Sequence, residues 1–351
     1  MKAVQLITVG APLEVRDVPM PEPNEDQVLV KVSGCGVCHT DIGFWKDGVP
    51  TRKGLPLTLG HEVSGVVVET GSRWKALRDR EVIVPAVMPC GECELCRSGR
   101  GNICRAQMMP GNDMDGGFAE YLTTPGRGLC VVEDRTGYDL HELSVIADAV
   151  TTPYQAIHRS GLKAGDLAIV VGVGGVGTYC VQIAAAMGAH VVAIDVDPAN
   201  LEAVATHGAG LTINSAETDF KTLRKQVRGQ AKDWGVAEHS WKIFECSGHA
   251  GGQETAYGLL TYASTLMVVG FTLDKVALRL SNAMAFDATI QGTWGCKPEL
   301  YPDALEMITG KKITLKPFIE THPMSEAPRL LQGVADHEFR KRVILTPDWD
   351  A

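Results

Sequence analysis

Four cysteines, Cys90, Cys93, Cys96 and Cys104, lie within fifteen residues with the spacing C-x2-C-x2-C-x7-C. Four thiolates this close in sequence can converge on one zinc ion, and four protein ligands leave no position for a substrate. The spacing therefore predicts a structural zinc site. An iron–sulfur cluster is an alternative, but no proline follows Cys104 and no second cysteine run is present. Disulfides are the other alternative, and nothing in the chain indicates an oxidising compartment.

A second set of metal-type residues lies upstream, in the segments GCGVCHTD and GHEVSG. Cys38 and His61 are ligands that suit zinc, and with one further protein ligand they would leave a coordination position open. The separation between them is weak evidence by itself, because a lone cysteine is usually a small core residue. Cys35 forms a C-x2-C pair with Cys38, and we interpret it as a buried packing residue.

A glycine-rich segment follows the apolar run DLAIVVG and precedes a helical pattern: Gly172, Gly174, Gly175, Val176 and Gly177. This is G-x-G-x-x-G between a strand and a helix, where free N–H groups of the helix can hold a pyrophosphate. Asp195 ends the next predicted strand, where a carboxylate can bind ribose hydroxyls and repel a 2′-phosphate. The alternative for Asp195 is a solvated acid at a strand end. The pattern favours NAD over NADP.

Strands and helices must position these residues. Residues 28–36, 64–71 and 81–87 are β-branched runs bounded by Gly and Pro, so the first third of the chain is predicted to be rich in strands. Further on, predicted strands at 166–172, 190–197, 241–248 and 265–270 alternate with helices, one of them at 176–188. Such alternation is typical of a doubly wound parallel sheet. We expect the tail, with a helix at 302–309 and a strand at 342–346, to return to the first domain.

Composition limits the possible functions. The chain has 351 residues, enough for two domains, and a net charge of −9 that argues against nucleic-acid binding. It has no apolar run long enough for a membrane span and no signal peptide at its N-terminus. We expect a cytoplasmic protein without membrane partners.

The motifs together resemble the zinc-dependent medium-chain alcohol dehydrogenases, in the order GCGVCHTD, GHEVSGVVVETG, the four-cysteine segment, TTPYQA and GVGGVG. The resemblance covers nearly the whole chain. It implies an α/β protein with a GroES-like β-rich catalytic domain, at residues 1–152 and 294–351, and a Rossmann NAD-binding domain at 153–293. It further implies two zinc ions per chain.

The resemblance also assigns roles to individual residues. Cys38, His61 and a third residue would bind the catalytic zinc; the third position matches Asp148, where cysteine is common, and Asp148 could alternatively cap a helix. Asp41 would orient the ligand histidine, and Thr40 would take the substrate proton unless it only caps a helix. Glu62 would be the glutamate that can approach the metal when water exchanges, so either Asp148 or Glu62 could be the third ligand. Gly43 stands where many relatives have a relay histidine. The implied cofactor contacts are Ser247, Val269, Gly270 and Arg342; Arg342 could alternatively be solvated.

Overall likeness, rather than any single motif, suggests a cyclic secondary alcohol carried as a CoA thioester, from anaerobic degradation of aromatic compounds, as the substrate. The CoA phosphates would need a local basic cluster, for which Arg52, Lys53 and Lys297 are candidates. A general secondary alcohol or polyol dehydrogenase is the first alternative, and a zinc-stabilised NAD-binding scaffold without catalysis is the second. The resemblance also implies a homo-oligomer, and we favour a tetramer over a dimer.

Overall fold

The computed structural model describes residues 1–349, which form two compact units. Among the described residues, unit 1 comprises 1–151, 295–309 and 315–349. Unit 2 comprises residues 152–294 and 310–314. Gly310–Thr314 belong to unit 2. The side chain of Gln182 accepts a hydrogen bond from the Thr314 N–H at 2.9 Å and donates one to the Thr314 carbonyl oxygen at 3.3 Å.

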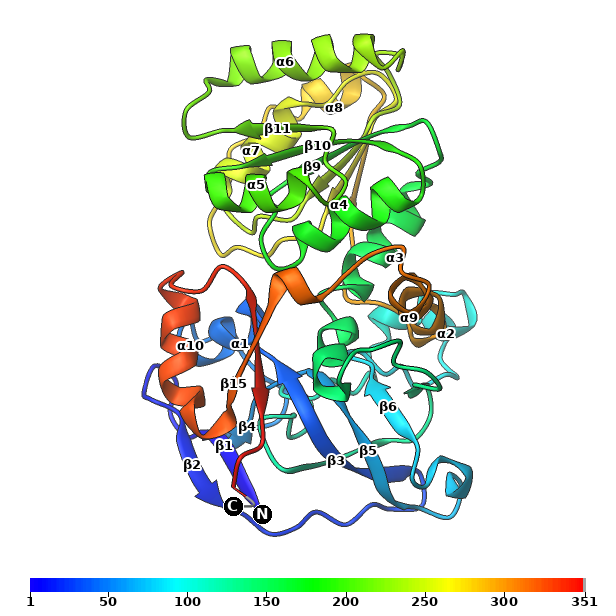
Figure 1. The fold of residues 1–351 in the computed structure, drawn as a ribbon, viewed down its shortest axis with the longest axis vertical. Helices are drawn as coiled ribbons and strands as arrows, with labels where there is room; N and C mark the ends of the chain where they lie inside the picture. Colours follow the sequence, from blue (N-terminus) through cyan, green and yellow to red (C-terminus); the bar gives the residue numbers. More distant parts are fainter. Residues whose placement is uncertain (350–351) are drawn as a thin grey trace. The chain divides into compact units, whose positions relative to one another are not determined.

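Unit 1 is built on two sheets (Figure 1). The small sheet has the order β2-β1-β4, with bounds Glu14–Asp17, Lys2–Leu6 and Leu57–Thr58. The large sheet has the order β15-β16-β3-β5-β6-β8, with β7 also paired to β3. Its strands are β15 (Ile319–Pro323), β16 (Arg342–Thr346), β3 (Gln27–Gly36), β5 (Glu62–Thr70), β6 (Glu81–Val84), β8 (Cys130–Val131) and β7 (Tyr121–Pro125).

Apolar residues that alternate along β3 and β5, such as Val28, Val30, Val63 and Val67, are buried in one core cluster of unit 1. The helices of unit 1 are α1 (His39–Trp45), α2 (Glu94–Arg97), α9 (Tyr301–Thr309) and α10 (Ala327–Ala335). Short 3-10 helices lie at Lys75–Leu77, Gly101–Ile103, Leu140–Ala147, Pro298–Leu300, Lys316–Phe318 and Met324–Glu326. The Leu140–Ala147 helix packs on β3 and β5 and ends next to Asp148.

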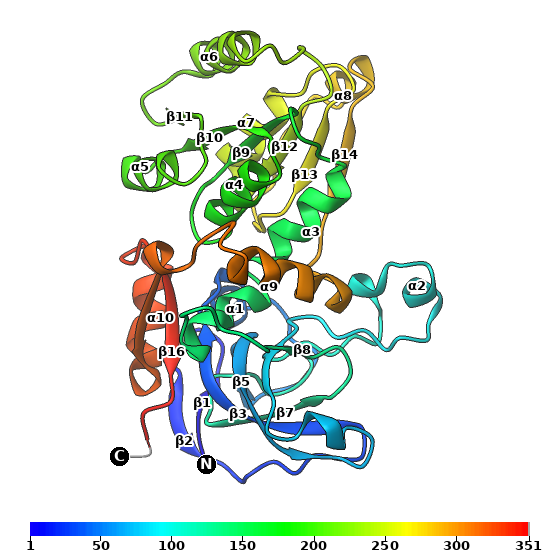
Figure 2. The same cartoon turned by 45° about the vertical axis from the view of Figure 1, so that its right-hand side comes forward.

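Unit 2 contains a parallel sheet with the order β11-β10-β9-β12-β13-β14 (Figure 2). Its strands are β9 (Leu167–Val171), β10 (His190–Asp195), β11 (Leu211–Asn214), β12 (Lys242–Glu245), β13 (Thr265–Val268) and β14 (Thr289–Gly292). Its helices are α3 (Thr151–Ser160), whose first residue belongs to unit 1, α4 (Gly177–Ala186), α5 (Pro198–Ala205), α6 (Phe220–Asp233), α7 (Ala250–Gly258) and α8 (Ser281–Ala285).

The order of the strands reverses at β9. From β9 the chain proceeds outward through β10 to β11 on one side, and later through β12 and β13 to β14 on the other. Because such crossovers are right-handed, the two sets of helices cover opposite faces of the sheet. In agreement, α4 and α5 pack on β9, β10 and β11, whereas α7 packs on β9, β12 and β13. The predicted doubly wound sheet is confirmed.

The strand predicted at 190–197 is two residues too long. It ends at Asp195, because the Asp195 Oδ1 atom accepts hydrogen bonds from the backbone N–H groups of Val196 and Asp197 at 2.7 and 2.9 Å. Asp197 then caps α5 through Ala199, with Pro198 in the first turn. The local turn therefore replaces the ladder hydrogen bonds that a longer strand would have made.

Candidate metal and cofactor sites

The four clustered cysteines bring their sulfur atoms together in unit 1. The Sγ–Sγ distances are 3.4 Å for Cys93–Cys96, 3.7 Å for Cys93–Cys104, 3.5 Å for Cys90–Cys104 and 3.9 Å for Cys90–Cys96. A tetrahedral zinc with Zn–S bonds near 2.3 Å separates its sulfurs by about 3.8 Å. Disulfide sulfurs would lie about 2.05 Å apart. The four thiols therefore fit a tetrahedral metal and exclude the disulfide alternative.

Backbone turns aim these sulfurs inward. Gly91 and Gly99 have φ values of +84° and +75°, in the left-handed region that favours glycine. Cys93 caps the short helix α2, which contains Cys96, so consecutive ligands lie on one turn. Most of the ligand set is thus positioned by local geometry.

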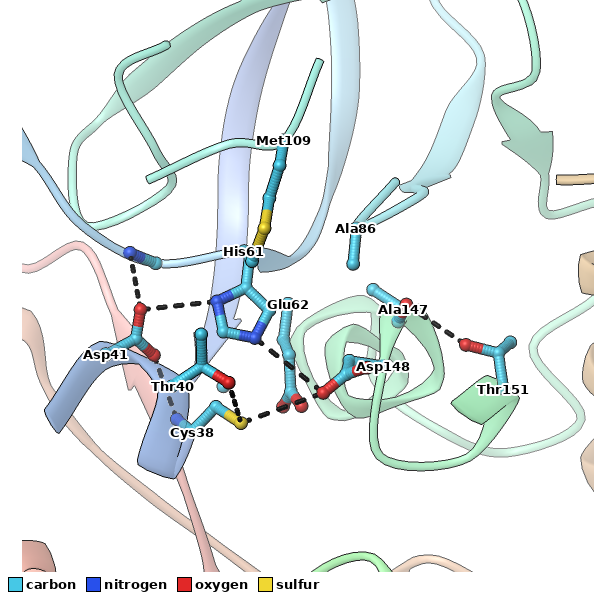
Figure 3. A network of polar contacts seen from close by, with 12 residues as sticks. Cys38, Thr40, Asp41, His61, Glu62, Ala86, Met109, Ala147, Asp148 and Thr151 are labelled. Atoms are coloured by element: carbon cyan, nitrogen blue, oxygen red, sulfur yellow. Dashed lines mark hydrogen bonds and ion pairs between the residues drawn. The ribbon is translucent and has the colours of Figure 1, made fainter. Parts of the chain in front are cut away.

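A second cluster in unit 1 gathers Cys38, His61, Glu62 and Asp148, whose ligand atoms lie within 4.8 Å of one another (Figure 3). The Asp148 Oδ2 atom lies 3.7 Å from Cys38 Sγ and 3.7 Å from His61 Nε2. Tetrahedral zinc with S, N and O ligands would set these distances at about 3.4–3.6 Å. The three residues therefore fit one metal ion. The third of them, Asp148, is a carboxylate at a position where cysteine is common in the family that the sequence resembles.

Asp41 connects two members of this cluster. Cys38 is the N-cap residue of α1, and its backbone N–H donates to Asp41 Oδ2 at 2.9 Å. The other oxygen, Oδ1, accepts from the Gly60 N–H at 3.1 Å and lies 3.3 Å from His61 Nδ1 (Figure 3). A carboxylate at Nδ1 favours the tautomer with the proton on that nitrogen, and in this tautomer Nε2 can bind a metal. This is the arrangement expected of a carboxylate that orients a ligand histidine.

Glu62 lies behind the cluster and is paired with Arg342. The Arg342 Nε donates to Glu62 Oε2 at 3.0 Å, and Nη2 contacts Oε1, so the pair is bidentate. Their side chains are 0% and 7% exposed. Gly36, directly across the ladder from Glu62, makes room for the carboxylate, because a Cβ there would lie 2.0 Å from Oε2. The cofactor contact that the family resemblance implies for Arg342 stays a prediction.

Electrostatics in this cluster follow from burial and from its charges. Burial raises the pKa of Glu62, and the Arg342 guanidinium opposes that shift. For Arg342 burial would lower the pKa, yet Glu62, Cys38 and Asp148 raise it well above its ordinary value. Burial also raises the pKa of Cys35 well above its usual range, so Cys35 stays a neutral thiol in the core. Arg342 is therefore permanently charged beside the cluster.

Tyr301 anchors the segment that carries Asp148. Its hydroxyl accepts a hydrogen bond from the Ala86 N–H at 3.0 Å and contacts the carbonyl of Ala147 as a donor. Thr151 Oγ1 donates to the same carbonyl at 3.1 Å (Figure 3). Tyr301 is fully buried at the start of α9. No local motif links Tyr301 to Ala147, so the sequence carries no signal for this residue.

In unit 2 the glycine-rich segment adopts the turn that its sequence predicts. Gly172 has φ +84°, and a Cβ on Gly177 would lie 1.8 Å from the Gly172 carbonyl oxygen. A Cβ on Gly174 would meet no atom within 4 Å, so its backbone faces open space. Asp195 Oδ2 accepts from the Val173 N–H at 2.6 Å, which joins the ends of β9 and β10. The loop, with Gly175 and Val176 half-buried before α4, can accept a pyrophosphate.

The remaining predicted cofactor residues lie at the ends of β12 and β13. A Cβ on Gly172 would lie 2.4 Å from Ser247 Cα, so Ser247 adjoins the glycine-rich loop. The Glu245 Oε1 atom accepts hydrogen bonds from both N–H and hydroxyl of Ser247, at 2.8 and 2.5 Å. Val269 and Gly270 donate their N–H groups to the Glu245 carbonyl oxygen, each at 2.9 Å. These residues therefore lie around the carboxyl end of the sheet, where ligands bind in such folds.

Comparisons with known proteins identify the family of the chain. The model of the alcohol dehydrogenase GroES-like domain matches residues 24–134, and the model of the zinc-binding dehydrogenase matches residues 175–310. An alcohol dehydrogenase of Geobacillus stearothermophilus is 30% identical over 348 residues, which is 98% of each chain. The chain belongs to the zinc-type medium-chain alcohol dehydrogenase family. As a member of that family it is an NAD(P)-dependent alcohol oxidoreductase, and its predicted fold class, GroES-like plus Rossmann, is confirmed.

Solved structures of other dehydrogenases have the same fold. Galactitol-1-phosphate dehydrogenase from Escherichia coli aligns with a TM-score of 0.88 at 25% identity, covering 99% of this chain and 100% of that one. A zinc-binding dehydrogenase structure from Sinorhizobium meliloti, bound to NADP, aligns with a TM-score of 0.85 at 27% identity and covers 99% of both chains. None of the helices in residues 1–349 is long and apolar enough to cross a membrane.

Proposed function

We propose that this alcohol dehydrogenase oxidises a secondary alcohol to a ketone with NAD⁺ and holds two zinc ions per chain. The observation that carries the proposal is the donor set of Cys38, His61 and Asp148, the first two buried and the third half-buried, which fits one metal with three ligands. A zinc ion held there would act as a Lewis acid on the substrate oxygen and lower the pKa of the hydroxyl. A scaffold without catalysis would need only the four-cysteine site.

The chain's own residues have distinct tasks in this proposal. Asp41 holds His61 and the backbone of Cys38 in place. Thr40 Oγ1 lies 3.6 Å from Cys38 Sγ, so its hydroxyl is close enough to the cluster to accept the proton of the substrate hydroxyl. Gly43 cannot pass that proton on, which leaves water or a ribose hydroxyl for the next step.

Metal analysis tests the catalytic assignment. Two zinc ions per chain in the native protein, and one in an Asp148→Ala variant with unchanged circular dichroism, are expected. One zinc in the native protein would support the scaffold instead. Asp148→Cys is the matched control, because a thiolate at this position should keep the second ion.

Asp195 supports NAD as the cofactor. Its carboxylate lies beside the glycine-rich loop and is followed by a second acid, Asp197, so a 2′-phosphate there would meet negative charge. Because one relative of known structure is bound to NADP, the activity of this chain must be measured with both NAD⁺ and NADP⁺. The ratio of kcat/KM for NAD⁺ to that for NADP⁺ should be high and should fall in Asp195→Ser. A native preference for NADP⁺ would contradict the proposal.

For the substrate, the narrower proposal is 6-hydroxycyclohex-1-ene-1-carbonyl-CoA, oxidised to the 6-oxo compound, and it rests on overall likeness. Two of the three candidate CoA-binding residues are paired with acids: Arg52 lies 3.2 Å from Asp113, and Lys53 lies 2.6 Å from Asp115. A general alcohol or polyol substrate is favoured by the relatives, among them the galactitol-1-phosphate dehydrogenase.

An NADH absorbance assay separates the two substrate classes. Turnover of the cyclic acyl-CoA alcohol at low concentration, without turnover of sorbitol, ethanol or threonine, would support the CoA proposal. The reverse result would support a polyol or general alcohol dehydrogenase. If phosphates are recognised by basic residues, the KM for the acyl-CoA should rise with salt.

We further propose a homo-oligomer, with a tetramer favoured over a dimer. β14 is the edge strand of its sheet, and the large apolar side chains of Leu280, Met284 and Ile290 near it are exposed. Exposed strand edges with apolar neighbours are commonly covered by another chain. Light scattering of the purified protein measures the oligomer directly.

A further inference from the structure

Glu245 is a buried carboxylate at the end of β12. It is the last residue of that strand, and its side chain belongs to a residue that is only 1% exposed. Within residues 1–349 no lysine, arginine or histidine forms an ion pair with Glu245, and its Oε2 atom has no hydrogen-bond partner. Buried charges are normally paired with a group of opposite charge. The unpaired charge of Glu245 therefore needs an explanation beyond packing.

Three donors hold the other carboxylate oxygen in place. Oε1 accepts hydrogen bonds from the N–H and the hydroxyl of Ser247, at 2.8 and 2.5 Å, and from the N–H of Gly248 at 3.2 Å. A Cβ on Gly252, in the first turn of α7, would lie 3.5 Å from Oε1, so the carboxylate is also close to the start of that helix. A helix N-terminus carries only about half a positive charge. The side chain is thus fixed, while part of its negative charge stays uncompensated.

Gly270 leaves room for the Oε2 atom. A Cβ on Gly270 would lie 2.9 Å from Oε2 and 2.2 Å from the backbone nitrogen of Gly248. The Gly270 N–H donates to the Glu245 carbonyl oxygen at 2.9 Å, which keeps the end of β13 beside the carboxylate. The charge therefore lies between the ends of two neighbouring strands, β12 and β13.

The strand order relates Glu245 to the two halves of a dinucleotide. The order reverses at β9, with β10 on one side and β12 on the other (Figure 2). A dinucleotide binds across such a point, with one mononucleotide on each side. In the proposed assignment the glycine-rich loop after β9 holds the pyrophosphate, and Asp195 at the end of β10 binds the adenosine ribose. The nicotinamide half then lies towards the ends of β12 and β13.

The two forms of the cofactor differ in charge at the nicotinamide ring. The ring of NAD⁺ is a cation, whereas the ring of NADH is neutral. A fixed negative charge that is shielded from solvent lowers the free energy of a nearby cation and has little effect on a neutral ring. Such a charge therefore raises the affinity for the oxidised form alone.

We propose that Glu245 supplies a fixed negative charge that raises the affinity of unit 2 for NAD⁺ relative to NADH. The form of the cofactor that alcohol oxidation consumes then competes effectively with the form that it produces. The inference rests on the proposed function, in which NAD is the cofactor. It concerns the ratio of two dissociation constants, so it is tested without measuring turnover.

The experiment compares the native protein with Glu245→Gln. Glutamine has nearly the same shape, keeps an oxygen atom that accepts from Ser247 and Gly248, and removes the charge. Glu254→Gln is the matched control, because it removes the same charge from an exposed residue of α7. The Kd of NAD⁺ is measured by calorimetry and the Kd of NADH by its fluorescence, both without an alcohol or ketone present.

In Glu245→Gln we expect the ratio of the NADH Kd to the NAD⁺ Kd to fall by about three- to tenfold, the size of a Coulomb interaction in a partly shielded site. The fall should come from weaker binding of NAD⁺, whereas the Kd of NADH should change little. Glu254→Gln should keep the native ratio. A loop that is merely loosened would weaken both forms alike, so an unchanged ratio in Glu245→Gln would overturn the inference.

Ser247→Ala serves where Glu245→Gln does not fold. It removes a hydroxyl that donates to the carboxylate, but it leaves the negative charge in place. The ratio should therefore stay at the native value or rise, and a fall would contradict the inference. A native protein that prefers NADP⁺ would instead contradict the proposed function, so the two failures are distinguishable.

Discussion

Asp41 Oδ1 lies 3.3 Å from His61 Nδ1, and both side chains are almost completely buried. The same carboxylate accepts the backbone N–H of Cys38 through its second oxygen. One acid thus holds two of the three residues that we assign to the metal, although it lies outside the set of ligand atoms itself.

Replacing Asp41 with Asn should weaken zinc binding. The NH₂ group of asparagine would face an N–H group that now donates a hydrogen bond to the carboxylate, so two donors would oppose each other. The substitution also removes the negative charge beside His61. Loss of such a supporting contact typically lowers metal affinity by about 10- to 100-fold. Competition with a chromophoric chelator measures the affinity. Asp47→Asn, an exposed acid just after α1, is the control and should change nothing.

Thr40→Val should slow alcohol oxidation severely. Valine keeps the shape of the side chain but has no hydroxyl to accept the substrate proton, and a positioned proton acceptor contributes about 10²- to 10⁴-fold to rate. Thr40→Ser retains the hydroxyl and should retain most of the activity. A Thr40→Val enzyme whose pH–rate profile matches that of the native enzyme would rule out the proton-transfer role.

Tyr301→Phe should destabilise unit 1. Removal of the hydroxyl leaves the Ala86 N–H without its hydrogen bond and removes a donor from the Ala147 carbonyl. An unsatisfied buried group costs about 1–3 kcal/mol of unfolding free energy. Urea unfolding measures the loss.

Zinc affinity should fall in the same variant, because Ala147 directly precedes Asp148. The control is Tyr262→Phe, since this tyrosine is 63% exposed. Equal unfolding free energies for both variants and the native protein would show that the Tyr301 hydroxyl does not anchor the Asp148 segment.

Gly43→Ala should stabilise the protein. Gly43 lies inside α1, where a Cβ would meet only Val49 Cγ2, at 3.5 Å. Alanine is favoured over glycine in a helix interior by about 1 kcal/mol. A higher melting temperature with unchanged kcat is expected, and a lower melting temperature would show that glycine serves the packing of α1.

The sequence predicted the parts of this protein that depend on neighbours in the chain. The four cysteines lie within one short segment, so their spacing and a few turns are enough to bring their sulfurs together. The glycine-rich loop is likewise local, because Gly172 to Gly177 connect one strand directly to one helix. The alternation of strands and helices predicted the doubly wound sheet for the same reason.

Contacts between distant residues were decided by the tertiary structure. Glu62 and Arg342 are 280 residues apart, and they meet because antiparallel pairing places β16 and β5 on the two sides of β3. Tyr301 reaches Ala147 only because the chain returns to unit 1 after Trp294. Residue types and spacing thus predicted which groups could bind a metal. Strand order determined which of these groups meet and which partner each of them has, since register between distant strands has no local signal in the sequence.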